Sequence, residues 1–428
     1  MKLRHLGWTV LALLLLLGAA AAGVVALNLR GEDPLPAASE AFQSTPQQVE
    51  RGRYLALAGN CAGCHTTRGG QPYAGGLPIE TPFGTVYSSN LTPDAQAGIG
   101  SWSSAHFWRA MHNGRSKDGR LLYPAFPYPN FTQVTREDSD AIYAYLRSVP
   151  AAAVPNQPHR LRFPYDTQAA LAVWRALSFQ PETFRPDAGK PAEWNRGAYL
   201  VGGLGHCIAC HGSRDSLGAT QTKLGLSGGL IAAENWYAPS LTDPHEAGVA
   251  DWPTAEVVAL LKTGTAPRGS VMGPMAEVVF RSTQYLSDAD LAAMASYLKD
   301  LPGAPAASAR PAAAPAPGRR DAAAMARGAR IYDQRCAYCH GDQGQGQPGA
   351  FPALAGNRAV TMARPTNLIQ VIAHGGYLPA TAGNPRPYGM PPFGQELDAS
   401  DVAAVLTYIR GSWGNDAAPV TQLDTMRR

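Results

Sequence analysis

The chain has 428 residues, of which 45% are hydrophobic and 16% charged, and its formal net charge is +4. This composition excludes a disordered chain, and the length suffices for about two to four domains. The small net charge, without a Lys/Arg block or a base-stacking motif, gives no indication of nucleic-acid binding.

The first 30 residues have the features of a membrane anchor or a secretion signal. Lys2, Arg4 and His5 precede an uncharged run from Leu6 to Leu29. This run of about 24 residues reaches roughly 36 Å as a helix and can cross a bilayer, whereas a signal peptide has an apolar stretch of about 7–15 residues. Basic residues in front of it favour a cytoplasmic N-terminus, so the remaining chain is predicted to be exported. In a bacterium this would place it on the periplasmic face of the inner membrane. The alanines at 19–22 keep a cleaved signal as the alternative.

The pentapeptide Cys-x-x-Cys-His accounts for all six cysteines. Its two thiols bond the vinyl groups of a haem, and its histidine supplies the proximal nitrogen to the iron. A structural zinc site would need four ligands, a thioredoxin-like pair needs no trailing histidine, and disulfides leave the three histidines unexplained. The sequence therefore predicts three covalently bound haem c groups. The attaching residues are Cys61, Cys64 and His65, then Cys207, Cys210 and His211, then Cys336, Cys339 and His340.

The same two helical signals flank each pentapeptide. An Arg-Gly pair on a short helix precedes it, at Arg51-Gly52, Arg196-Gly197 and Arg327-Gly328. An acidic helix with apolar residues at helical spacing closes each repeat, at Asp140–Leu146, Asp290–Leu298 and Asp401–Ile409. This is the plan of a small mono-haem cytochrome. We therefore predict a mainly α protein with three tandem class I-like cytochrome c domains, at 46–150, 191–302 and 321–412, behind the transmembrane or signal helix at 1–30.

Three further segments lie between or behind these domains. A connector at 151–190 carries one apolar helix, Gln168–Phe179, with Leu171 and Trp174. It either packs between two haem domains or contacts the membrane surface or a partner subunit. An Ala/Pro-rich stretch at 303–320 is typical of a semi-extended linker, so the third domain either moves or docks through its own surface. Residues 413–428 form a C-terminal tail.

Methionine is a common second axial ligand in electron-transfer haems and raises their potential. Met390, within Gly-Met-Pro-Pro, lies shortly before the third closing helix, where such a ligand belongs. Met275 holds the matching place in the second repeat. Met272 competes with it, whereas Met294 lies on the closing helix and is predicted to be core.

The first repeat lacks a methionine at that place and has Phe126 instead. The remaining candidates are Met111, His112 and His106. Met111 matches Leu261 of the second repeat and so also fits a core position, and His112 matches Lys262, which suits a helix C-terminus. The sixth position of the first haem is therefore open: Met111, His112 or no ligand.

From Gly52 to Ile409 the chain resembles the tri-haem cytochrome c subunit of membrane-bound bacterial dehydrogenases acting on alcohols, aldehydes, gluconate and related substrates. Besides the haem motifs, the resemblance rests on Asn90–Trp102, Tyr123–Tyr128, Gly273–Val278 and Gly389–Pro392. It implies a catalytic partner with a quinone-like, flavin or molybdenum cofactor. It also implies that electrons leave through a respiratory chain, to ubiquinone or a terminal oxidase. The family often has methionine where Phe126 stands.

The chain contains neither a Gly-rich dinucleotide fingerprint after a strand nor a P-loop. We therefore expect no substrate-oxidising site of its own. Two other functions share the same haem content: a free-standing relay from quinol to oxidase, and a catalytic cytochrome with an open iron position at the first haem. The sequence does not identify the partner's substrate, the haem potentials, the order of electron flow or the acceptor.

Overall fold

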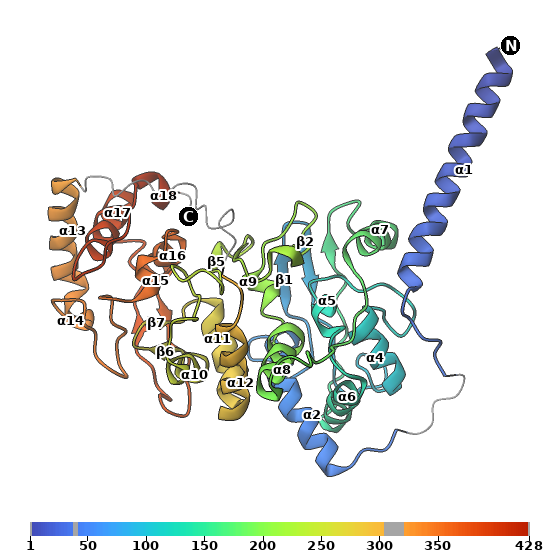
Figure 1. Cartoon of the computed structure of the whole chain (residues 1–428), viewed down its shortest axis with the longest axis horizontal. Coiled ribbons are helices and arrows are strands. Elements are labelled where there is room, and N and C mark those ends of the chain that lie inside the picture. The colour runs from blue at the N-terminus through green and yellow to red at the C-terminus, as the bar shows by residue number, and fades with distance from the viewer. Residues whose placement is uncertain (1, 37–41, 304–320, 427–428) are drawn as a thin grey trace. The chain divides into compact units, whose positions relative to one another are not determined.

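The structure, a computed structural model, describes residues 2–36, 42–303 and 321–426 (Figure 1). It divides into two compact units. Unit 1 is formed by residues 1–53, 64–185 and 216–219, and unit 2 by residues 54–63, 186–215 and 220–428. The proposed linker at 303–320 lies outside the described residues except for its first residue.

The part of the chain up to residue 185 consists of helices, one small sheet and long loops. In chain order its elements are α1 (Lys2–Leu29), α2 (Pro46–Ala58), α3 (Cys61–His65), β1 (Pro78–Thr81), β2 (Gly84–Tyr87), α4 (Ser104–Asn113), α5 (Tyr128–Phe131), α6 (Arg136–Ser148), β3 (Arg160–Leu161) and α7 (Gln168–Ser178). The three strands form one antiparallel sheet in the order β1-β2-β3, with Ile79 opposite Val86 and Thr85 opposite Arg160.

Unit 2 repeats this pattern twice. The first set is α8 (Ala192–Tyr199), the π-helix η1 (Leu200–Leu204), α9 (Ile208–His211), η2 (Thr222–Leu224), β4 (Gly229–Ile231), β5 (Trp236–Ala238), α10 (Thr254–Thr263), β6 (Thr265–Ala266), β7 (Gly269–Ser270), α11 (Pro274–Arg281), η3 (Thr283–Tyr285) and α12 (Asp288–Lys299). The second set is α13 (Ala322–Arg335), α14 (Ala337–His340), α15 (Arg358–Thr361), α16 (Thr366–His374), β8 (Gly376–Tyr377), β9 (Gly389–Met390), α17 (Ala399–Arg410) and α18 (Gln422–Met426). Each strand pair here is a separate two-stranded antiparallel sheet.

The Arg-Gly pairs mark the places where the first helix of each repeat crosses its closing helix. A Cβ atom added to Gly52, Gly197 or Gly328 would lie 1.8, 1.9 or 2.2 Å from a carbonyl oxygen of the closing helix. Those oxygens belong to Ala141, Ala293 and Ala404. Only glycine therefore permits the two backbones to approach this closely. The sequence predicted both helices of each pair, and the structure confirms them.

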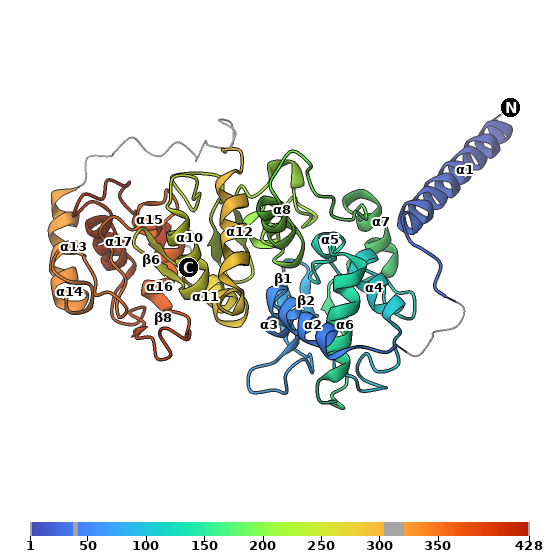
Figure 2. The ribbon, with the colours of Figure 1, turned by 60° about the horizontal axis from the view of Figure 1, so that its bottom comes forward.

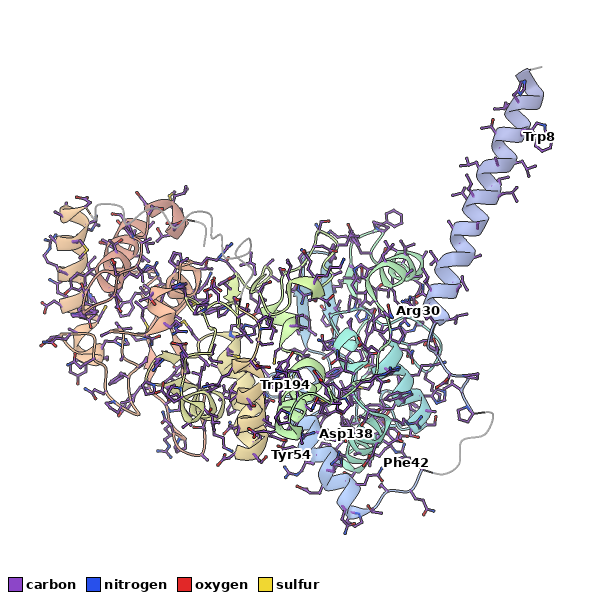
Figure 3. The ribbon with its side chains drawn as sticks, viewed as in Figure 1. Trp8, Arg30, Phe42, Tyr54, Asp138 and Trp194 are labelled. Atoms are coloured by element: carbon purple, nitrogen blue, oxygen red, sulfur yellow. The ribbon has the colours of Figure 1, made fainter. Side chains whose placement is uncertain are left out.

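The arginine of each pair holds an aspartate at the start of the same closing helix. Arg51 reaches Asp138 at 2.5 Å, Arg196 reaches Asp290 at 2.8 Å and Arg327 reaches Asp401 at 2.7 Å. Figure 3 labels Asp138. Each aspartate is the third residue of its helix, and its backbone N–H is capped by the side chain of Thr135, Ser287 or Asp398. A carboxylate there is also favoured by the helix dipole.

The second and third repeats are joined within unit 2 by direct hydrogen bonds. Asn367 and Tyr237 exchange two of them, at 2.7 and 2.9 Å, and Arg358 donates to the carbonyl of Gly248 at 2.6 Å. Arg358 also lies over the ring of Trp252, 5.4 Å from its centroid. Of the two alternatives for the third repeat, the structure shows it docked through its own surface.

One helix among the described residues, α1, is long and apolar enough over His5–Leu29 to cross a membrane. The connector helix α7 begins at Gln168, as predicted, behind the cap Thr167. It ends at Ser178, one residue before the predicted end. Leu171 and Phe179 are buried within unit 1, and the indole of Trp174 donates to the carbonyl of Leu217 at 3.0 Å. The inner face of α7 is therefore core of unit 1.

Candidate haem-binding sites

Each Cys-x-x-Cys-His segment forms one short helical turn directly behind the first helix of its repeat. The turns are α3, the segment Cys207–His211 that contains α9, and Cys336–His340 with α14. The first and second cysteines are thus one turn apart and lie on the same side of the backbone. The following histidine closes the turn. The crossing of the first helix with the closing helix therefore fixes the direction from which all three side chains project.

All three motif histidines are held in the same way. Their Nδ1 atoms lie against backbone carbonyls: His65 at 2.6 Å from Ser89 O, His211 at 2.7 Å from Pro239 O and His340 at 2.9 Å from Pro352 O. A carbonyl oxygen can only accept a hydrogen bond, so Nδ1 carries the hydrogen and Nε2 keeps its lone pair. This is the arrangement that orients an imidazole for binding to a metal.

The motifs alone do not identify these carbonyls, although the sequence carries a signal for them. The acceptor residue stands two positions before a leucine in every repeat, at Leu91, Leu241 and Leu354. Without the fold, such a leucine indicates only that the repeats are alike. In the structure this segment supplies the carbonyl that accepts the hydrogen bond of the motif histidine.

Burial of the motif side chains changes their protonation. Burial lowers the pKa of His65, His211 and His340, which favours the neutral imidazole. It raises the pKa of the Cys207 thiol to about 12 and that of Cys336 to about 11. Apolar surroundings of this kind suit the edge of a porphyrin.

The third repeat has the most complete site. Two adjoining cavities are both lined by Cys336, His340 and Met390. Their walls are mostly apolar, with Leu368, Ile372, Phe393, Leu406 and Ile409 among them. The donor set and the apolar lining therefore fit a haem between His340 and Met390.

The two methionine candidates of the second repeat lie in different surroundings. Met272 lines both cavities of the third repeat and packs against its core. Met275 lies on the first turn of α11, behind Gly273, whose φ of 52° turns the chain between them. Met272 thus belongs to the wall of the third repeat's cavities, and Met275 stays the predicted sixth ligand of the second haem. Met294 is buried core, as expected.

Replacing these two methionines separately tests that assignment. Met275→Leu should free one iron position, so that the chain binds one more carbon monoxide per molecule than the parent, because leucine offers no lone pair. Met272→Leu makes the same change in size at a nearby position. It should leave the number of carbon monoxide molecules bound per chain unchanged. Titration of the reduced protein with carbon monoxide measures this. An extra site in Met272→Leu but not in Met275→Leu would reverse the assignment.

In the first repeat the structure distinguishes the surroundings of the candidates. His106 caps α4, with its Nδ1 2.7 Å from Ser103 Oγ. The buried ring of His112 stacks on Trp108 at 4.4 Å, and burial lowers its pKa. Phe126 packs beside Phe131, with 5.4 Å between ring centroids.

The repeats relate these positions to one another. Gly114 and Gly375, both left-handed with φ of 58° and 70°, end α4 and α16. Counting back from them, Met111 matches Ile372, which lines the third cavity, and His112 matches Ala373, which does not. By this alignment Met111, and not His112, matches a residue that lines the third cavity. The sixth position of the first haem stays open between Met111, His112 and no ligand.

Comparison with known proteins agrees with this geometry. The cytochrome c family model matches residues 49–150, 195–302 and 325–413, one match for each repeat. An alcohol dehydrogenase (quinone) cytochrome c subunit from Gluconacetobacter polyoxogenes is 41% identical over 91% of this chain and 86% of its own length. A gluconate 2-dehydrogenase cytochrome c subunit from Pantoea cypripedii is 38% identical over 89% of each chain.

A third relative is a longer protein. A nicotinate dehydrogenase subunit from Pseudomonas putida is 41% identical over 86% of this chain, which covers 30% of that protein. The chain matches one family model three times, and its similarity to these relatives extends over most of its length. It belongs to the cytochrome c family, and over most of its length its relatives are cytochrome c subunits of alcohol and gluconate dehydrogenases.

Proposed function

We propose that this chain is the electron-transfer subunit of a periplasmic, membrane-bound dehydrogenase and carries three haem c groups. The observation that carries the proposal is the threefold recurrence of one arrangement: a Cys-x-x-Cys-His turn whose histidine donates from Nδ1 to a backbone carbonyl. The haems would occupy class I-like domains at 46–150, 191–302 and 321–412. Bound haem iron supplies the chemistry by alternating between the ferrous and ferric states.

The protein residues set the conditions for that chemistry. His65, His211 and His340 would provide the proximal nitrogens, and the cysteines at 61, 64, 207, 210, 336 and 339 the thioether bonds. Met275 and Met390 would occupy the sixth positions of the second and third haems and raise their potentials. The apolar walls around Cys336 would keep water from the third haem.

We propose that α1 is a retained anchor with its N-terminus in the cytoplasm, so that the chain after Arg30 lies in the periplasm. Its length and composition support this. The proposal for the partner is a catalytic dehydrogenase subunit that carries a quinone-like, flavin or molybdenum cofactor. Relatives named for alcohol, gluconate and nicotinate support a shared electron-transfer role with differing substrates. The acceptor would be ubiquinone or a terminal oxidase.

Purification of the native complex tests this function. The full chain, tagged at its C-terminus and solubilised from its own membranes, should co-purify with a larger dehydrogenase subunit. One substrate from a panel of a primary alcohol, an aldehyde, gluconate and nicotinate should then reduce the haems. The matched control is the same preparation stripped of the partner by a salt wash, which the substrate should not reduce. Recovery of the chain alone, with rapid reduction by quinol, would instead indicate a free-standing relay.

A further inference from the structure

The end of α1 is bound to the connector helix α7 within unit 1. The side-chain amide of Asn28 donates to the carbonyl of Ala172 at 2.9 Å, and Arg30 donates to the carbonyl of Phe179 at 3.0 Å. Figures 1 and 2 both show α7 beside this end of α1, and Figure 3 labels Arg30 there. Asn28 belongs to the apolar span His5–Leu29. The middle of α7 therefore lies level with the last turn of that span.

The orientation of α7 about its own axis is fixed by its inner face. Arg175, its only charged residue, is 2% exposed, lies over the ring of Phe179 and donates to the carbonyl of Asn113. Leu171 is buried on the same face. Because Arg175 is turned inward, the outer face of the helix carries no charge.

The outer face carries a row of apolar residues at a spacing of four. Ala169, Val173 and Leu177 are all exposed, Val173 by 48% and Leu177 by 73%. Single exposed apolar side chains are common on soluble proteins. This row differs because α7 is hydrogen-bonded to the end of a long apolar helix, on which Val25 and Leu29 are also more than half exposed.

We infer that α7 lies in the headgroup region of the outer leaflet, with Ala169, Val173 and Leu177 against the acyl chains. The inference rests on the proposed membrane anchor. A span of 25 residues is roughly 37 Å long, against a hydrocarbon core of about 30 Å and about 40–45 Å with the headgroups. Its last turn, and α7 with it, therefore falls in the interfacial layer. Interfacial helices bury their apolar face about 5–10 Å deep.

Photolabelling from within the bilayer tests this inference. The full haem-loaded chain is reconstituted in phosphatidylcholine vesicles that contain a phosphatidylcholine with a diazirine in its acyl chain, and adducts are mapped by mass spectrometry. We expect adducts on α1 and on α7, and none on residues 46–53 of α2, which lie away from the end of α1 in both views (Figures 1 and 2). The double variant Val173→Ser/Leu177→Ser should lose α7 adducts at least about fivefold and keep those on α1.

The outcomes separate this inference from the anchor on which it rests. Adducts on α1 but none on α7 would overturn the inference and leave the anchor standing. Adducts on neither helix would show that the anchor itself is wrong. Adducts on α7 that disappear when the dehydrogenase partner binds would show that α7 is a protein interface, which also overturns the inference.

Discussion

Replacing Gly328 with alanine should destabilise the third repeat, although alanine is the better helix former. The added Cβ would lie 2.2 Å from Ala404 O and 2.7 Å from the Cβ of Tyr408. Since backbone cannot yield as a flexible side chain does, the two helices must separate. Overpacking of this kind costs about 1–3 kcal/mol, which exceeds the gain of about 1 kcal/mol expected from helix propensity. Hydrogen exchange of peptides from α13 and α17 measures the free energy of local opening.

Gly383→Ala is the matched control in the same repeat. A Cβ added at Gly383 would meet no atom within 4 Å. This substitution should change the free energy of local opening by no more than about 0.5 kcal/mol. Equal protection of α13 and α17 from hydrogen exchange in the two variants would show that Gly328 does not pack closely against the backbone of α17.

Replacing Met390 with histidine should lower the potential of one haem and slow electron flow through the protein. Met390 lines both cavities that contain His340. Axial ligands tune haem potentials over about 0.8 V, and methionine favours the ferrous state relative to histidine, so a fall on the order of 0.2 V is expected. A spectroelectrochemical titration resolves the potentials of the three haems. Substrate-driven turnover of the complex should fall together with the potential of the third haem.

Met362 provides the control for this prediction. It is also a buried methionine of the third repeat, but it does not line either cavity. Met362→Leu should leave all three potentials unchanged. A titration in which Met390→His also matches the parent would exclude Met390 as a ligand and direct attention to another side chain of that cavity.

Helices were the part of this fold that the sequence predicted best. The Arg-Gly pairs and the closing helices are repeated three times, and both are fixed by local signals, namely apolar spacing and caps. In the first repeat the acid equivalent to Asp290 and Asp401 is Asp138, which pairs with Arg51, whereas Asp140 pairs with Arg136. Asp138 and Asp140 both lie near the start of α6, so residue type alone did not show which of them pairs with Arg51.

The strands and the contacts between repeats were not predicted from the sequence. The strands have two to four residues, too few for an alternating pattern to stand out. The docking of the third repeat on the second depends on Asn367, Arg358 and their backbone partners. The partners of such polar surface residues can be identified only when both folded surfaces are known. For the same reason, the haem-attaching residues were found at once, whereas the carbonyls that orient their histidines were not.

The mass of the intact mature chain tests the central claim most directly. A chain purified from a host that matures c-type cytochromes should carry the mass of its polypeptide plus three haems, and digestion should place one haem on each Cys-x-x-Cys-His peptide. A polypeptide without added mass, or one in which any of the three peptides is recovered unmodified from a fully matured preparation, would contradict the account.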